Sequence, residues 1–330
     1  MGRLVVVLTV VVAACTPPSA APPDTAPPSV SSSVSTTPAA PSTTTTTTTT
    51  TSLPPTTTGP GTTTPATAAS TSLPATTSPQ SSGRYRGAVG FGTGLTADVF
   101  APTDPGPYPV AVLVHGGGWV AGDRRSMWPL ADALAGRGFV AYAVEYRTLA
   151  RGGRFPETVD DVACAVRLAR RDASRMTTTP DRVVLVGHSA GAHLSALVAY
   201  GGDEFGTTCP DSGPQDVIGF VGLAGPYDTD RLELVLGPFF GTRLVDDPAP
   251  WRRGNPFTYV RSGLDVPSLL IHGEADPVVP PLFTEELAAA LEEVGTPVEL
   301  RLLEGVDHSE VIDPDVVGDL IDEWVRGLAP

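Results

Sequence analysis

The sequence predicts an α/β fold with a mainly parallel central sheet, helices on both faces and an opening antiparallel hairpin. Two observations support this prediction. From residue 84 onward, short apolar runs alternate with longer segments of helical periodicity. Strands that read as continuous apolar runs are typical of parallel sheets buried on both faces by crossover helices. Residues 84–330 are also numerous enough to build one large hydrophobic core.

The elements are expected in the following order. Residues 84–90 and 95–101 form the opening hairpin. Further strands are predicted at 110–114, 139–144, 183–186, 217–223, 268–271 and 298–303, and helices at 127–136, 158–172, 194–200, 282–294 and 315–328. Residues 226–262 interrupt this alternation and are rich in Pro, Gly and aromatic residues. We expect them to form a cap or a pocket-lining excursion outside the sheet.

The segment before residue 84 has a different composition. Residues 16–83 are almost wholly Thr, Ser, Pro, Ala and Gly, and the first aromatic residue of the chain is Tyr85. A segment with so little apolar surface does not offset the entropy lost on ordering. Residues 16–83 are therefore predicted to be a disordered linker, and residues 84–330 to be the folded domain.

The first fifteen residues have the pattern of an export signal. Arg3 precedes an apolar run at 4–14, which is much shorter than the roughly 20 residues that span a bilayer as a helix. The Val-Ala-Ala-Cys sequence at 12–15 resembles the lipobox of bacterial lipoprotein signal peptides. The resemblance implies that residues 1–15 contain a signal peptide and that Cys15 is lipid-modified. The chain would then be exported and lipid-anchored on the outer face of a bacterial cell membrane; the alternative is an ordinary signal and a secreted protein.

Charge and cysteine content bear on the partners, metal sites and disulfides to be expected. The net charge is −15 and all 21 basic residues are Arg, with no basic stripe, so nucleic acid is not an expected partner. Cys164 and Cys209 lack paired Cys/His spacing, so no metal site is expected. In an exported protein the two cysteines are candidates for a disulfide. The sequence alone does not say whether they lie close enough to bond.

A glycine-flanked serine follows the apolar run 183–186. The pentapeptide Gly-His-Ser-Ala-Gly at 187–191 is followed by a helix-like stretch. In a strand–turn–helix context this G-x-S-x-G pattern forms a sharp turn that exposes the serine hydroxyl. The pattern predicts that Ser189 is a catalytic nucleophile.

A serine nucleophile needs a base, and the base needs an acid that orients it. His308 follows the last predicted strand, at the carboxyl edge of the sheet where loops converge, and is the predicted base. His188, His193 and His272 are expected to have structural roles: His188 diverges from the nucleophile, His193 packs in the helix and His272 bonds to the backbone.

The predicted acid is Asp276, in the loop after the strand 268–271. The Pro-Val-Val-Pro that follows it favours an aspartate-led turn into the next helix. Glu274 and Asp307 are the rivals. Asp307 is beside His308 in sequence and would have to reach around the ring to Nδ1.

A glycine run directly follows the strand 110–114, in the sequence His-Gly-Gly-Gly-Trp at 115–119. Glycines allow close backbone approach to a ligand, and preorganised N–H groups stabilise negative charge that develops on a carbonyl oxygen. Neither G-x-G-x-x-G nor a trailing Gly-Lys-Ser/Thr is present, so nucleotide binding is not expected.

Taken in chain order, the motifs HGGGW, GHSAG, HGEADPVVP and GVDHS resemble the α/β-hydrolase fold over essentially all of 84–330. Within that fold the chain is most similar to esterases of the feruloyl-esterase-like and hormone-sensitive-lipase-like groups. The HGEAD form of the acid loop departs from that of hormone-sensitive-lipase relatives and favours the feruloyl-esterase-like side. The resemblance implies a triad of Ser189, Asp276 and His308, and an oxyanion hole formed by the amides of Gly117, Gly118 and Ala190.

These features predict a serine hydrolase that cleaves carboxylic esters through an acyl-enzyme intermediate, without a cofactor or a metal. The expected partner is a small-molecule or cell-envelope ester. One alternative is an amide-type hydrolase, such as an aryl formamidase or a peptidase-like enzyme, because the same triad serves both bonds. Another is a non-catalytic surface-binding protein on a hydrolase scaffold. The sequence leaves the oligomeric state open.

Overall fold

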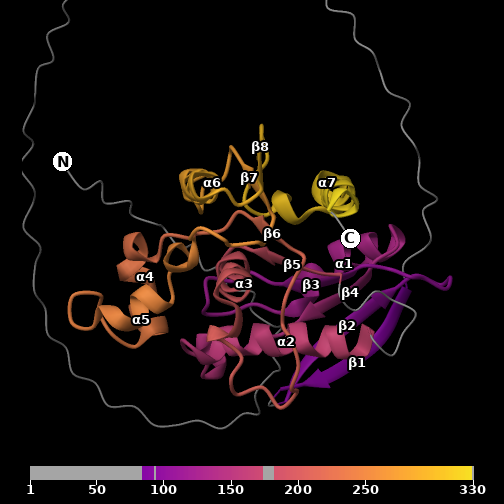
Figure 1. The fold of residues 1–330 in the computed structure, drawn as a ribbon, viewed down its shortest axis with the longest axis horizontal. Coiled ribbons are helices and arrows are strands. Elements are labelled where there is room, and N and C mark those ends of the chain that lie inside the picture. The colour runs from indigo at the N-terminus through magenta and orange to yellow at the C-terminus, as the bar shows by residue number, and fades with distance from the viewer. Residues whose placement is uncertain (1–83, 93, 174–181, 329–330) are drawn as a thin grey trace, which may run out of the picture. The chain divides into compact units, whose positions relative to one another are not determined.

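An eight-stranded sheet forms the centre of the protein, in the order β1-β2-β4-β3-β5-β6-β7-β8 (Figure 1). The computed structural model describes residues 84–92, 94–173 and 182–328. The signal peptide at 1–15, the lipidation of Cys15 and the linker at 16–83 lie outside the described residues and stay predictions. The pairs β1–β2 and β2–β4 are antiparallel and the other pairs are parallel.

Each predicted strand is present, with its ends within two residues of the expected positions. The strands are β1 (Arg84–Phe91), β2 (Leu95–Ala101), β3 (Val110–Val114), β4 (Val140–Val144), β5 (Val183–His188), β6 (Gly219–Leu223), β7 (Ser268–Gly273) and β8 (Val298–Leu303). β5 continues past the apolar run because Gly187 and His188 still pair with β6, opposite Gly222 and Leu223. The strand therefore runs to the residue before Ser189.

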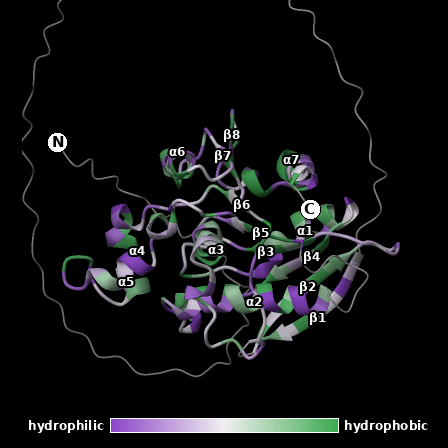
Figure 2. Cartoon of the chain, viewed as in Figure 1, coloured by the Kyte–Doolittle hydropathy of each residue, from purple (hydrophilic) through white to green (hydrophobic). Residues whose placement is uncertain are grey.

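Helices cover both faces of the sheet (Figure 1). Alternate residues of β3 face opposite cores: Val112 packs with one face and Leu113 with the other. Figure 2 shows polar and apolar residues alternating along α2 (Glu157–Ala173). This pattern is typical of a helix with one buried side. One face is covered by α2 (Glu157–Ala173), α3 (Ala190–Gly201) and α6 (Leu282–Val294), and the other by α1 (Trp128–Gly136) and α7 (Pro314–Gly327).

Helix α3 begins four residues earlier than predicted. The prediction began it at residue 194, whereas it begins at Ala190, directly after the nucleophile candidate. Small residues and Gly191 weaken the helical pattern there, so periodicity alone did not detect the first turn. The consequence is that Ser189 lies at the point where a strand ends and a helix begins.

Residues 226–262 form an excursion from the sheet and contribute no strand to it. Their elements are the 3-10 turns η4 (Thr229–Leu232) and η5 (Pro256–Tyr259) and the short helices α4 (Glu233–Phe240) and α5 (Pro248–Arg253). Asp247 caps α5 by accepting a hydrogen bond from the Ala249 amide at 3.0 Å. The rings of Phe240 and Trp251 lie 4.4 Å apart and hold the two helices together.

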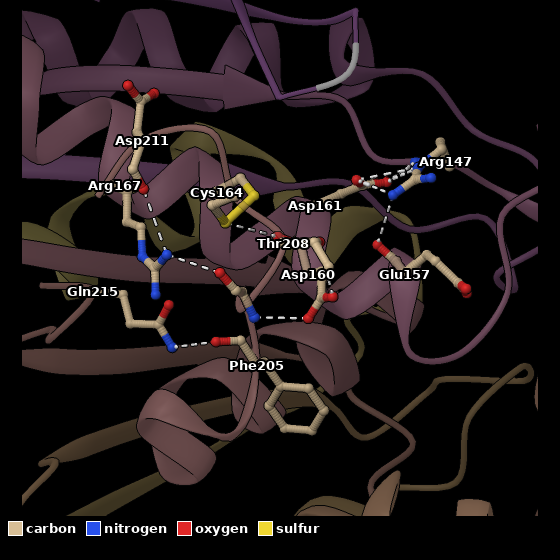
Figure 3. Close-up of a disulfide and its surroundings, with 12 residues drawn as sticks. Arg147, Glu157, Asp160, Asp161, Cys164, Arg167, Phe205, Thr208, Asp211 and Gln215 are labelled. Carbon is tan, nitrogen blue, oxygen red and sulfur yellow. Dashed lines mark hydrogen bonds and ion pairs between the residues drawn. A yellow bond between two sulfur atoms is a disulfide. The ribbon is translucent and has the colours of Figure 1, made fainter. Parts of the chain in front are cut away.

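A disulfide joins Cys164 on α2 to Cys209, and it closes a separation of 45 residues (Figure 3). The Cα atoms are 5.3 Å apart, within the range that a disulfide spans. Asp160 supports the same loop, because its carboxylate accepts hydrogen bonds from the Gly206 amide at 2.7 Å and from Thr208 Oγ1 at 3.2 Å. The segment after α3 is thus tied to α2 by one covalent bond and by hydrogen bonds.

Candidate active site

Ser189 lies on a sharp turn between β5 and α3, with a φ of 53° that non-glycine residues rarely adopt. The glycines on either side are required by space. A Cβ on Gly187 would lie 2.4 Å from the Gly191 carbonyl oxygen, and a Cβ on Gly191 would lie 2.4 Å from the Val114 carbonyl oxygen. The Ser189 amide donates to the Leu223 carbonyl at 2.8 Å, which holds the turn against β6. Strain of this kind persists only where the surrounding structure enforces it, and it concentrates at functional sites.

The structure brings Ser189, His308 and Asp276 into one hydrogen-bonded chain. Ser189 Oγ lies 3.0 Å from His308 Nε2, and His308 Nδ1 lies 2.7 Å from Asp276 Oδ2. The carboxylate accepts the proton on Nδ1, so Nε2 is left free to accept the serine proton. The Asp276 side chain is fully buried, whereas that of His308 is 13% exposed. This is the geometry of a nucleophile, a base and an orienting acid.

Asp276 is held as an anion by its donors. Burial alone would raise the pKa of its carboxyl, but hydrogen bonds from His272, His308 and the Val279 amide outweigh burial and lower it below the ordinary value. Oδ1 accepts from the amides of Val278 and Val279 at 2.7 and 2.8 Å. The turn expected from the Pro-Val-Val-Pro sequence is therefore the feature that supplies two of the donors.

His272 has a role that the sequence analysis found only in part. Its Nε2 donates to the Val279 carbonyl at 2.9 Å, as expected of a backbone contact, but it also lies 3.1 Å from Asp276 Oδ2. Nδ1 then accepts from the Thr284 hydroxyl at 2.6 Å, so the tautomer is determined by its partners. His272 thus orients the acid as well as the backbone around it.

His188 also contacts the site, although it was expected to point away from it. Its Nε2 donates to the carbonyl oxygen of His308 at 2.9 Å, and the two rings lie 4.8 Å apart. Burial, followed by the proximity of His308, lowers the pKa of His188 to about 3. A neutral His188 therefore fixes the backbone of His308. Sequence adjacency to Ser189 was the only available signal of this contact.

The rivals for the acid lie elsewhere. Glu274 is exposed. Asp307 Oδ1 accepts from the amides of Ser309 and Glu310 at 2.7 and 2.9 Å and so organises the turn after His308. Of the three carboxylates, Asp276 is the one that the structure places against His308 Nδ1.

The glycine run lies against the nucleophile turn. A Cβ added to Gly116 would lie 3.1 Å from Ser189 Cβ, so the two segments are in direct proximity. Gly117, Gly118 and Trp119 have φ values of 122°, 60° and 61°. Among the described residues, none accepts a hydrogen bond from the amides of Gly117, Gly118 or Ala190. These three amides are therefore available to an oxygen beside Ser189.

His115 and Tyr146 contact each other and the start of this loop. Their rings stack with centroids 4.2 Å apart, and the Tyr146 hydroxyl donates to the His115 carbonyl at 3.0 Å. His115 Nδ1 lies 2.7 Å from the Gly116 carbonyl. Burial lowers the pKa of His115, so the ring stays neutral.

The described ranges contain no group of three or more His, Cys, Asp or Glu side chains arranged to hold a metal ion. Within the same ranges, no helix has both the length and the apolar character needed to cross a membrane.

A comparison with known families matches residues 97–291 to the BD-FAE family model. The matched region is more than half of the chain and includes Ser189, Asp276 and the glycine run. The chain belongs to the BD-FAE family. The BD-FAE match ends before His308, so the assignment of this residue rests on the hydrogen bonds given above.

Curated relatives of this BD-FAE protein include two esterases of Mycobacterium tuberculosis. LipQ is 28% identical over 197 residues, and LipC is 31% identical over 195 residues. These matches cover 57% and 54% of this chain and 46% of each relative. The chain therefore spans about half the length of the curated relatives it matches.

Solved structures extend the likeness to the fold. The native structure of a thermophilic esterase from Thermogutta terrifontis superposes with a TM-score of 0.61 at 26% identity, covering 72% of this chain and 90% of that one. The same esterase is known with butyrate bound, at a TM-score of 0.62 and 26% identity, with 72% and 92% covered, and in a form phosphonylated by sarin. This likeness confirms the predicted α/β-hydrolase fold.

Proposed function

We propose that this protein is a carboxylesterase that cleaves esters with a short acyl group through an acyl-serine intermediate. The observation that carries the proposal is the Ser189–His308–Asp276 chain of hydrogen bonds near three amides for which the described residues supply no acceptor. A non-catalytic binding protein would not need a base, an acid and unpaired donors around one strained serine.

In the first half of the reaction, Ser189 Oγ attacks the ester carbonyl carbon while His308 Nε2 takes the hydroxyl proton. The carbonyl oxygen becomes negatively charged and accepts hydrogen bonds from the amides of Gly117, Gly118 and Ala190. The C–O bond to the alcohol then breaks, and His308 returns its proton to the leaving oxygen. The products of this half are the free alcohol and the acyl group bound to Ser189.

In the second half, a water molecule gives a proton to His308 Nε2 and attacks the acyl carbon. The tetrahedral intermediate collapses, Ser189 recovers its proton from His308, and the carboxylic acid leaves. Asp276 keeps the imidazole in the Nδ1–H tautomer and stabilises the imidazolium that forms in both halves. His272 and the two amides keep Asp276 ionised throughout.

The preference for short acyl groups rests on the solved relatives. The Thermogutta terrifontis esterase is known with propionate and with butyrate bound. Both are small carboxylic acids, the product class of a short-chain esterase. By likeness of fold, we propose that this protein also acts on small acyl esters.

We further propose that the protein is exported and acts outside the cytoplasm. A lipid on Cys15 would anchor it to the membrane, and residues 16–83 would be the tether. The Cys164–Cys209 disulfide supports export, because disulfides persist in oxidising compartments. Mass spectrometry of the mature N-terminus tests the anchor. A lipid-modified Cys15 is the expected result, and an unmodified terminus at another residue would contradict it.

The catalytic proposal is tested with Ser189→Ala. We expect this variant to lose turnover of p-nitrophenyl butyrate by about 10⁶-fold, to the level set by binding and the oxyanion donors alone. Its circular dichroism spectrum and melting temperature are expected to match those of the parent protein. Retained turnover in a folded variant would contradict the proposal, and faster cleavage of the matching p-nitroanilide would favour an amide hydrolase instead.

A further inference from the structure

His193 lies one helical turn beyond Ser189 on α3 and is fully buried. Its backbone amide donates to the Ser189 carbonyl at 3.2 Å, so the His193 backbone lies in the first turn after the nucleophile. The two ring nitrogens contact two other parts of the site. Nδ1 lies 3.1 Å from Trp119 Nε1, in the glycine-run loop, and Nε2 lies 2.8 Å from the Gly254 carbonyl, at the end of α5.

The two partners determine the protonation of the ring. The indole N–H of Trp119 can only donate, so Nδ1 must accept and carries no proton. The Gly254 carbonyl can only accept, so Nε2 must carry the proton and donate it. His193 is thus a neutral imidazole that bridges one donor and one acceptor. A second proton on the ring would break the contact with Trp119.

Trp119 belongs to the glycine-run loop, whose backbone is strained and needs support from its surroundings. Gly117, Gly118 and Trp119 are three consecutive residues with positive φ, and this conformation is sterically strained for Trp119 because it is not glycine. Its side chain is 3% exposed and packs edge-on against His193, with ring centroids 5.4 Å apart. Its carbonyl also accepts from the Leu149 amide at 2.9 Å. Among the described residues, His193 is the one hydrogen-bond partner of the Trp119 indole.

The other end of the bridge is equally well packed. A Cβ on Gly254 would lie 2.2 Å from the Phe240 ring, so there is no room for a side chain at this position. The Phe239 ring lies 6.1 Å from that of Trp119 and 6.4 Å from that of His193. The excursion at 226–262 is therefore joined to the glycine loop by aromatic contacts and through one imidazole.

We propose that His193 is a positioning residue that holds the oxyanion-binding loop in its strained conformation by bridging Trp119 to the Gly254 carbonyl of the excursion. The proposal rests on the proposed esterase function. His193 does not touch the substrate; it acts through Trp119 on the directions of the Gly117 and Gly118 amides. The excursion thereby becomes a fixed support of the oxyanion hole.

The test compares His193→Leu with His193→Gln. Leucine fills the space but leaves the Trp119 N–H and the Gly254 carbonyl without partners, so the loop is free to relax. Removing one oxyanion donor costs about 10²–10³ in kcat, so a displaced loop is expected to lower kcat by about 10- to 100-fold with KM changed less than threefold. Glutamine keeps one acceptor and one donor at a similar spacing. It is expected to restore kcat to within about fivefold of the parent protein.

Two further variants separate positioning from general destabilisation. Trp119→Phe removes only the indole donor and is expected to lower kcat like His193→Leu, with no added loss in the double variant. Tyr200→Phe is the matched control, since it lies on the same helix and loses a buried 2.8 Å hydrogen bond to Ser268 Oγ. It is expected to lower the melting temperature while kcat stays within twofold. Trp119→Phe and His193→Gln decide the question if His193→Leu does not fold.

The bridge also has a readout that needs no substrate. In protein with ¹⁵N-labelled tryptophan, the Trp119 indole proton, assigned with Trp119→Phe, is expected to exchange with solvent much faster in His193→Leu than in the parent. Unchanged kcat with unchanged exchange in a folded His193→Leu, or additive losses in the double variant, would overturn the proposal. A parent protein that hydrolyses no ester would overturn the proposed function instead, while the exchange experiment still tests the bridge.

Discussion

Asp276 receives hydrogen bonds from four donors, two from imidazoles and two from backbone amides. Together they keep the carboxylate ionised in a buried position where it would otherwise bind a proton. The Asp276 carboxylate fixes the proton of His308 on Nδ1, and the Val279 carbonyl fixes that of His272 on Nε2. The hydrogen-bond partners of each side chain therefore determine its protonation state in the free protein.

Replacing Asp276 with asparagine tests this arrangement. The amide retains an oxygen for the Val278 and Val279 donors but no longer stabilises the Nδ1–H tautomer or the imidazolium of His308. We expect kcat to fall by about 10³- to 10⁴-fold with the fold intact. Glu274→Gln and Asp307→Asn are matched controls, because each removes one carboxylate from the rival positions. A loss in either control as large as that of Asp276→Asn would show that the acid is misassigned.

Buried neutral histidines predict a dependence of stability on pH. Burial lowers the pKa of His193 to about 4, and that of His188 to about 3, from 6.5. Below about pH 6.5 the unfolded chain binds protons at these residues while the folded chain does not. The free energy of unfolding should therefore fall as the pH is lowered from 6.5 to 4, by up to about 1.4 kcal/mol per pH unit for each residue.

Urea unfolding at several pH values measures this slope. His193→Gln removes one titrating group, so its unfolding free energy is expected to vary less steeply with pH over the same window. The lowered pKa of Asp276 affects stability at more acidic pH. There the carboxylate becomes protonated, and its contribution to the free energy of unfolding is lost. If the unfolding free energy of the parent protein rose as the pH was lowered from 6.5 to 4, the burial of neutral histidine rings would be contradicted.

At the scale of elements, the loop after β3 and the turn after β5 define the site together. Gly117 shows how tightly the loop is built, because a Cβ there would lie 2.1 Å from the Ala121 carbonyl oxygen at a φ of 122°. The loop has no room to absorb a methyl group without moving its backbone. Any such movement changes the directions of the loop amides that we propose as oxyanion donors.

Gly117→Ala is therefore expected to lower kcat by about 10²-fold, the cost of losing one oxyanion donor. Gly295→Ala is the control, since Gly295 also has a positive φ, of 81°, at the end of α6, but with nothing within 4 Å of its added Cβ. It is expected to cost about 1 kcal/mol of stability with no change in kcat. Equal kcat losses in the two variants, measured with p-nitrophenyl butyrate, would refute a specific role for the loop.

The disulfide is a second element-scale feature, remote from the triad in its contacts. Closing a loop over 45 residues is worth about 4 kcal/mol in the chain-entropy model. The double variant Cys164→Ser with Cys209→Ser is expected to lose about 2–4 kcal/mol of unfolding free energy and to retain its kcat. Guanidinium unfolding with and without dithiothreitol measures this. Dithiothreitol should destabilise the parent protein and leave the stability of the double variant unchanged. Equal unfolding free energies of the parent protein and the double variant in the absence of dithiothreitol would contradict the prediction.

For the whole molecule, the sheet and the three residues that the structure joins in one hydrogen-bonded chain, Ser189, His308 and Asp276, could be predicted because their signals are local in sequence. Apolar runs mark strands, and the serine, acid and base each lie in a motif that follows a strand. The supporting contacts have no such signal. His188 reaches a carbonyl 120 residues away and His193 one 61 residues away, and only the folded chain brings these partners together. The start of α3 was missed for a different reason, since small residues at a sharp turn have weak helical periodicity.

We propose above all that Ser189 is a nucleophile activated by the fold around it. The most direct test of this proposal is the reaction of the protein with a fluorophosphonate, followed by peptide mass spectrometry. We expect one adduct, on Ser189, in the folded protein, and no adduct at this serine after unfolding in urea. A folded protein that stays unlabelled at Ser189, or that carries the adduct on another residue, would contradict it.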